Sequence, residues 1–163
     1  MIKALLMSLV INLYGPPVFI SELTHKDKQE GLRWEKVCLA VNSYHEAKNQ
    51  SVAGQLAVMY VVLNRVDDKR YPNTICGVIK QGNKKSCAFS WHCDGKSDHI
   101  SNSKLYADLY ILATMVIDSA IPKIDITEGA THYHADYVTP YWADSLEKVT
   151  QIDSHIFYRK LDI

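Results

Sequence analysis

Apolar residues recur at helical spacing along the first three quarters of the chain. Between residues 32 and 47 they follow three- and four-residue steps, which predicts an amphipathic helix over 32–47. Residues 51–66 are apolar on nearly every side, a pattern typical of a helix in the middle of a domain. Thr74 is expected to cap a short third helix, and the helical period returns over residues 103–120.

The pattern changes after Pro122. Residues 130–135, 149–152 and 155–158 are short runs of aromatic and β-branched residues separated by turn signals, which predicts a small antiparallel sheet. Helices followed by a minor sheet indicate an α+β domain with a helical core.

The N-terminal residues suggest three segments. Lys3 and the apolar run that follows it predict that residues 1–20 form an export signal or anchor, with a helix packed on the domain as the alternative. The apolar run is too short to cross a membrane, so transient membrane anchoring is the most it predicts. Residues 21–31 are polar and are interpreted as a linker, and residues 32–163 as a single domain.

Composition narrows the class of protein. The chain has 163 residues, of which 47% are hydrophobic and 22% are charged, the balance of one globular domain. Formal net charge is zero, whereas a nucleic-acid binder needs a basic surplus on one face. We therefore expect no binding to nucleic acid. We also expect the chain to be a monomer.

Four cysteines bear on the cellular compartment. Their spacing is too irregular for a zinc ribbon, and Cys87 and Cys93 bracket a short loop. The favoured pairing is Cys87–Cys93 with Cys38–Cys76, and disulfides indicate an oxidising location, secreted or periplasmic. The alternative is four buried thiols in a cytosolic protein.

Glu46 is the first candidate for chemistry. The predicted helix places it in the last turn, among apolar neighbours. Burial and the field at a helix C-terminus both disfavour a negative charge, so they raise a carboxyl pKa towards the range of a proton donor at neutral pH. The alternative is an ordinary surface residue or salt-bridge partner.

Two residues of the second helix also stand out. Gly54 is costly inside a helix, so we expect another backbone to approach it closely. Arg65 is expected to pair with a carboxylate or to lie exposed at the helix end.

Several motifs in this order resemble the SleB/CwlJ cell wall hydrolase family, over roughly residues 38–159. The matching segments are Tyr44-His45-Glu46-Ala47, residues 57–66, residues 71–79, Phe89-Ser90-Trp91, Thr131-His132-Tyr133-His134, Pro140-Tyr141-Trp142 and residues 152–158. The resemblance implies a lysozyme-like α+β fold and an enzyme that cuts the glycan strands of peptidoglycan, in some members as a lytic transglycosylase. It also implies that Glu46 is the catalytic glutamate and that no cofactor is needed.

The chain departs from the family directly after Glu46. The family's Arg-Gly-Glu is replaced by Lys48-Asn49-Gln50, so a second acidic position holds an amide. A hydrolase needs two carboxyl groups, whereas a transglycosylase can use one glutamate as acid and then as base. The departure favours the transglycosylase, with Asp94, Asp98 and Asp136 as second acids if the enzyme is a hydrolase.

Four residues are expected to bind the substrate. Ser90 can bond to a sugar or to Glu46, and Tyr133 can orient an acetamido group. Trp91 and Trp142 can stack on sugar rings, with core packing as the alternative for both.

Two other functions fit parts of the sequence. His132 and His134 share a strand face and, with His155 or His45, are the ligand set of a zinc-dependent amidase or peptidase. A non-catalytic wall-binding module is the third hypothesis for the function. The short chain with an export segment also suggests a phage endolysin.

Overall fold

The computed structural model describes residues 28–83, 86–121 and 123–160. The predicted export segment 1–20 lies outside these residues. Helix α2 begins at Lys28, so the last four residues of the predicted linker 21–31 are helical and that boundary was wrong. None of the described helices is long and apolar enough to cross a membrane.

The helical part of the chain begins and ends where the sequence pattern changes. Ser51, Thr74 and Asn102 each accept a hydrogen bond from a backbone N–H three residues later, which caps one helix start. These caps explain why the helices start where they do. The helices are α2 (Lys28–Ala47), α3 (Val52–Asp67), α4 (Ile75–Ile79) and α5 (Ser103–Ile117), with 3-10 turns η2 (Ser90–His92) and η3 (Ala143–Ser145).

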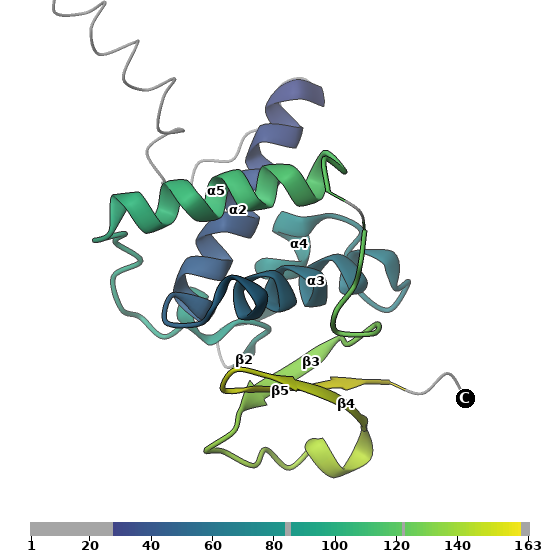
Figure 1. Cartoon of the computed structure of the whole chain (residues 1–163). Helices are drawn as coiled ribbons and strands as arrows, with labels where there is room; N and C mark the ends of the chain where they lie inside the picture. Colours follow the sequence, from purple (N-terminus) through teal and green to yellow (C-terminus); the bar gives the residue numbers. More distant parts are fainter. Residues whose placement is uncertain (1–27, 84–85, 122, 161–163) are drawn as a thin grey trace, which may run out of the picture.

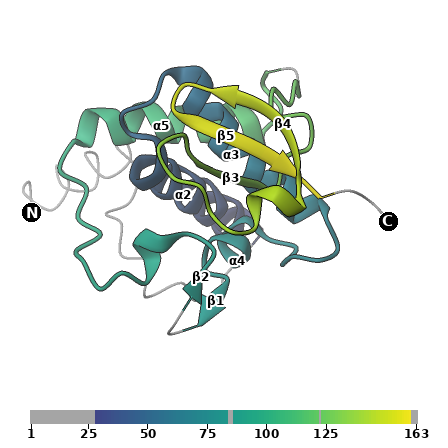
Figure 2. The same ribbon diagram turned by 90° about the horizontal axis from the view of Figure 1, so that it is seen from below.

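Helix α2 is the centre of the domain. It packs against α3, α4 and α5, as Figures 1 and 2 show. Leu39, Ala40 and Val41 are fully buried, so α2 is covered on more sides than the amphipathic pattern predicted. The main core fills the space between these helices and also includes Phe89 and Trp91 from around η2.

The sheet lies beneath α3 in Figure 1. Its strands have the order β3-β5-β4 and every neighbouring pair is antiparallel. A second core of Ala57, Val61, Ala130 and Phe157 joins α3 to the sheet. The fold class is therefore confirmed as mostly helical with small antiparallel sheets. The strands are β3 (His132–Ala135), β4 (Glu147–Ile152), β5 (His155–Arg159) and a separate hairpin of β1 (Gly82–Asn83) and β2 (Ser86–Cys87).

The two faces of the sheet carry different residues. Tyr133 pairs with Phe157 and His132 with Tyr158, and side chains alternate between faces along a strand. Phe157 belongs to the core under α3, so the inner face carries Tyr133, His155 and Phe157. The outer face carries His132, His134 and Tyr158.

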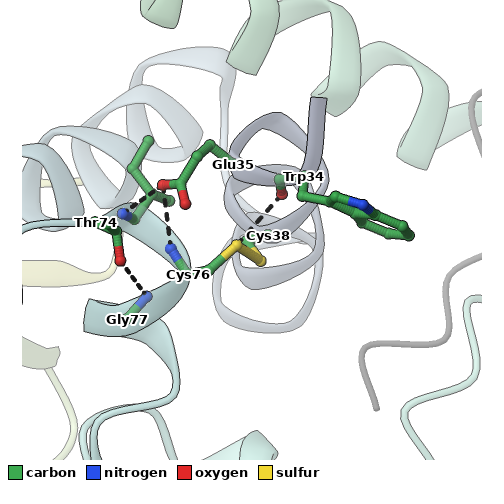
Figure 3. The surroundings of a disulfide bond; sticks show 7 residues. Trp34, Glu35, Cys38, Thr74, Cys76 and Gly77 are labelled. Carbon is green, nitrogen blue, oxygen red and sulfur yellow. Dashed lines mark hydrogen bonds between the residues drawn. A yellow bond between two sulfur atoms is a disulfide. The ribbon is translucent and has the colours of Figure 1, made fainter. Parts of the chain in front are cut away.

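Both predicted disulfides are present. Cys38–Cys76 ties α2 to α4, and Cys87–Cys93 closes the loop that contains η2. Glu35 lies one turn before Cys38 and accepts hydrogen bonds from the backbone N–H groups at the start of α4 (Figure 3). A covalent bond and a carboxyl acceptor therefore hold α4 against α2 at the same place.

The turn between β4 and β5 is fixed to the start of α3. Asp153 Oδ2 accepts hydrogen bonds from the backbone N–H and the hydroxyl of Ser51, at 2.8 and 2.7 Å. A Cβ atom on Gly54 would overlap this carboxylate and lie 2.8 Å from Gln50 Cβ. The close approach predicted at Gly54 is real, but it is made by side chains and not by another backbone.

Candidate active site

Glu46 lies at the junction of two helices. It is in the last turn of α2, which ends at Ala47, and α3 begins five residues later. The turn between them is closed by a hydrogen bond from the Gln50 N–H to the Ala47 carbonyl at 3.0 Å. The side chain of Glu46 is half-buried. The predicted position at the end of a core helix is confirmed.

Tyr133 reaches the acid from the inner face of the sheet. Its hydroxyl donates a hydrogen bond to Glu46 Oε2 at 2.7 Å. Its ring packs at 5.0 Å from the His155 ring and 5.6 Å from the Phe157 ring, which fixes its orientation. Burial, together with the neighbouring Glu46 carboxylate, raises the pKa of Tyr133 well above its ordinary value. The phenol therefore keeps its proton and acts as a donor.

The surroundings of Glu46 favour its protonated form. Burial raises the pKa of Glu46, while the hydrogen bond from Tyr133 and the positive charge of Arg65 act in the opposite direction. Burial is the largest effect, so the pKa stays above its ordinary value. A carboxyl group whose pKa is raised in this way can donate a proton and then hold the resulting charge.

Arg65 is not exposed at the helix end, and the hydrogen bond of its side chain goes to a backbone carbonyl. Arg65 is 8% exposed, and its Nε donates a hydrogen bond to the Thr131 carbonyl at 2.7 Å. The guanidinium also lies 5.1 Å from the centre of the Phe89 ring and 5.5 Å from that of Tyr71. An arginine within an otherwise apolar helix is the sequence signal that points to a buried partner.

Ser90 and Trp91 occupy adjacent positions in η2 but have different environments. Ser90 is exposed. Trp91 is 8% exposed, donates its indole N–H to Asn42 Oδ1 at 2.9 Å and stacks on His45 at 4.6 Å between ring centres. The core packing alternative describes Trp91 best, and this packing fixes η2 against the end of α2. Sugar binding by Ser90 stays a prediction.

Trp142 lies on the other side of the sheet from the acid. Its ring contacts His132, His134 and Tyr158, all on the outer face, at 5.3, 5.6 and 5.5 Å between ring centres. Tyr133 belongs to the inner face, so the sheet separates Trp142 from the Tyr133–Glu46 pair. Trp142 is half-buried in this cluster of outer-face rings, and its predicted sugar contact does not lie beside Glu46.

The histidines of the zinc alternative do not converge. His132 and His134 share the outer face, as predicted, but His155 lies on the inner face against Tyr133. His134 Nε2 is hydrogen-bonded to the Tyr158 hydroxyl at 2.9 Å. Within the described residues, no group of three histidine, cysteine or acidic side chains is arranged to hold a metal ion. His132, His134 and His155 therefore do not form the ligand set that the zinc alternative predicted.

Gln50, at the position of the family's second acid, has a structural role. Gln50 Oε1 accepts hydrogen bonds from the Ser154 hydroxyl at 3.1 Å and from its N–H at 3.3 Å. The amide therefore helps to fix the β4–β5 turn. Asp94, Asp98 and Asp136 are exposed, and as second acids they stay predictions.

Comparisons with known proteins identify the family of the chain. The profile of the family described as Cell Wall Hydrolase matches residues 49–158, a match that begins three residues after Glu46. The spore cortex-lytic enzyme of Halalkalibacterium halodurans is 30% identical over 115 residues, which are 70% of this chain and 31% of that protein. The chain thus spans less than a third of the length of this curated relative.

Two solved structures have the same fold. One is the catalytic domain of the Bacillus cereus SleB protein, with 25% identity and a TM-score of 0.58 over 89% of this chain and 100% of that one. The other is the catalytic domain of the germination-specific lytic transglycosylase SleB from Bacillus anthracis, with 26% identity and a TM-score of 0.60 over 84% of this chain and 100% of that one. Sequence and structure together show that the chain belongs to the cell wall hydrolase family.

Proposed function

We propose that this chain cuts peptidoglycan glycan strands between N-acetylmuramic acid and N-acetylglucosamine as a lytic transglycosylase, with Glu46 as its single acid and base. The observation that carries this proposal is the half-buried Glu46 carboxyl group held by the Tyr133 hydroxyl at 2.7 Å. The relative from Bacillus anthracis, whose name includes lytic transglycosylase activity, supports the same reaction.

The reaction consists of two proton transfers at the same carboxyl group. Glu46 first donates its proton to the glycosidic oxygen, the bond from that oxygen to C1 of the muramic acid breaks, and N-acetylglucosamine leaves with a free 4-hydroxyl. The Glu46 carboxylate then removes the proton from the 6-hydroxyl of the same muramic acid while its O6 bonds to C1. The product is a 1,6-anhydro end, and Glu46 has regained its proton. No water is consumed.

Tyr133 has a defined part in this cycle. Its hydroxyl points at the carboxyl group and keeps its own proton, so it can orient Glu46 in both protonation states. It also stabilises the carboxylate after the first transfer, since a hydrogen bond to a charged acceptor is stronger than one to a neutral acceptor. We assign Ser90, exposed at the start of η2, to sugar binding.

The replacement of the second family acid supports a single-acid scheme. Gln50 cannot serve as a base, and its amide oxygen is already engaged by Ser154. A hydrolase on this scaffold would need a second carboxylate, either to activate water on the far side of the sugar ring from Glu46 or to act as the nucleophile.

Two disulfides favour a location in the cell envelope, since such bonds persist in oxidising compartments. A role in phage lysis is a further proposal. Expression with an export signal in a bacterial host tests it: lysis on induction supports a lysis enzyme, and growth without lysis contradicts it.

The proposed reaction is tested by incubating purified sacculi with the enzyme and identifying the released muropeptides by mass spectrometry. We expect anhydro-muramic ends from the wild type and a loss of at least about a hundredfold in release rate for Glu46→Gln. Glu30→Gln, the same change in the exposed first turn of α2, is the matched control and should keep full activity. Reducing ends would show a hydrolase, and free peptides an amidase.

A further inference from the structure

Arg65 is fixed by contacts from three parts of the chain. It projects from the last turn of α3, and its Nε donates a hydrogen bond to the Thr131 carbonyl at 2.7 Å. Its guanidinium lies 5.5 Å from the centre of the Tyr71 ring and 5.1 Å from that of Phe89. Only 8% of the residue is exposed. A guanidinium held in this way has little freedom to move and keeps its charge.

The contact with Thr131 bears directly on the catalytic pair. Thr131 immediately precedes β3, and Tyr133 is the second residue of that strand. The hydrogen bond therefore joins the end of α3 to the start of the strand that presents the Tyr133 hydroxyl to Glu46. The positive charge of Arg65 also lowers the pKa of both Glu46 and Tyr133, against the larger effect of burial.

We propose that Arg65 is a positioning residue of this reaction: it anchors the strand that carries Tyr133 and supplies a fixed positive charge to the carboxylate that Glu46 becomes after donating its proton. This inference rests on the proposed function, because it assigns Arg65 a part in the same proton transfers. Arg65 acts through Tyr133 and through space, and the hydrogen bond that it makes goes to a backbone carbonyl.

The three histidines around the pair are shifted toward their neutral forms, while the charged groups that act on them are Asp136 and Asp153 at His155 and Asp98, Asp94 and Lys48 at His45. Burial and nearby cations, Arg65 first among them, lower the pKa of His132 to about 4. Burial lowers the pKa of His155, whose ring contacts Tyr133, and it also lowers that of His45, which precedes Glu46 on α2. The charge that favours the Glu46 carboxylate is therefore that of Arg65.

The test compares two variants. Arg65→Met removes the charge and the hydrogen bond, whereas Arg65→Lys keeps a positive charge but lacks the planar set of N–H donors of the guanidinium. The pH dependence of kcat and KM is measured on soluble glycan fragments. Activity of a general acid is lost as pH rises through its pKa, and loss of a nearby positive charge raises that pKa. For Arg65→Met we expect the alkaline limb to move up by about one pH unit and kcat to fall about tenfold, with KM little changed.

Arg65→Lys separates the two parts of the role. We expect its alkaline limb to stay in place while kcat falls, because the charge remains and the anchor is lost. Lys104→Met removes an equivalent charge from the exposed surface of α5. It should change neither the pH of the alkaline limb nor kcat. A merely structural arginine would lower the melting temperature and the yield of folded enzyme but leave the pH limb of the folded fraction unmoved, and that result would overturn the proposal.

A second measurement does not depend on activity. Titration of ¹³C-labelled glutamate carboxyls by NMR, with the Glu46 signal assigned from its absence in Glu46→Gln, follows Glu46 directly. We expect Glu46 to titrate at higher pH in Arg65→Met than in the wild type. Unchanged titration contradicts the inference, even for an enzyme that releases anhydro ends. If the wild type releases no muropeptides, the proposed function fails, and the titration still decides whether Arg65 acts on Glu46.

Discussion

The hydroxyl of Tyr133 donates a hydrogen bond to Glu46 Oε2 at 2.7 Å, although 87 positions separate the two residues. One residue comes from the end of the central helix and the other from the inner face of the sheet. The chain between them forms α3, α4 and α5, which pack with α2 in the helical core, and the connection to the sheet. Correct folding of both parts is thus needed to assemble the proton donor with its orienting phenol.

Tyr133→Phe removes this hydrogen bond and leaves the ring packed on His155 and Phe157. The bond stabilises the carboxylate, so its loss raises the pKa of Glu46 further. We expect kcat/KM to fall about tenfold to a hundredfold and its alkaline limb to move to higher pH. A pH–rate profile on soluble glycan fragments measures both effects.

Tyr158→Phe is the control for that variant, because it removes a phenol of the outer face that is hydrogen-bonded to His134. It should keep the wild-type pH profile. Equal losses in the two variants would mean that Tyr133 only supports the fold.

Glu46→Gln should be more stable than the wild type at neutral and alkaline pH. The folded-state pKa of Glu46 is raised above its ordinary value of 4.5, so its contribution to stability is fully present below about that pH and is lost as pH rises through the raised value. The glutamine of the variant does not ionise, so the variant does not lose stability in this way as pH rises. Melting curves from pH 4 to pH 8 should show a difference that grows with pH, and a constant difference would contradict the assigned burial effect.

The helical part of the site was predictable, because local spacing determines it. Apolar residues at three- and four-residue steps place Glu46 in the last turn of α2, and Ser51 and Thr74 cap helices by contacts within four residues. The disulfide pairing followed from the short loop between Cys87 and Cys93, which leaves one partner for Cys38.

The long-range contacts were not predictable in the same way. Strand alternation separates Tyr133 from His132, but only the packing of Phe157 on α3 decides which face turns to the acid. Trp142 lies in an irregular segment without periodicity, so nothing in the sequence places it on the outer face. The contact from Arg65 to Thr131 spans 66 positions and depends on how α3 lies on the sheet.

Gly54→Ala should destabilise the domain by about 1–3 kcal/mol, because the added methyl group overlaps Asp153 and Gln50 where the β4–β5 turn meets α3. Gly31→Ala is the matched control: it is also within a helix, but nothing lies within 4 Å of its Cβ position. It should be neutral or stabilising by up to about 1 kcal/mol. Urea unfolding measures both, and equal effects would contradict the close packing at Gly54.

The two disulfides should contribute unequally to stability. Cys38 and Cys76 are 38 positions apart, whereas Cys87 and Cys93 are 6 apart, and a longer closed loop restricts the unfolded chain more. Replacing both members of a pair by alanine should cost about 4 kcal/mol for Cys38–Cys76 and about 2 kcal/mol for Cys87–Cys93. Chemical unfolding of the two double variants checks this order, which the reverse ranking would contradict.

The central claim is that one carboxyl group cuts the strand without water. Digestion of sacculi in water enriched in ¹⁸O, followed by mass spectrometry of the released muropeptides, tests it most directly. The account predicts anhydro-muramic ends that carry no ¹⁸O from the wild type, and no such products from Glu46→Gln. Incorporation of one ¹⁸O atom at a reducing end, or release at the wild-type rate by Glu46→Gln, would contradict it.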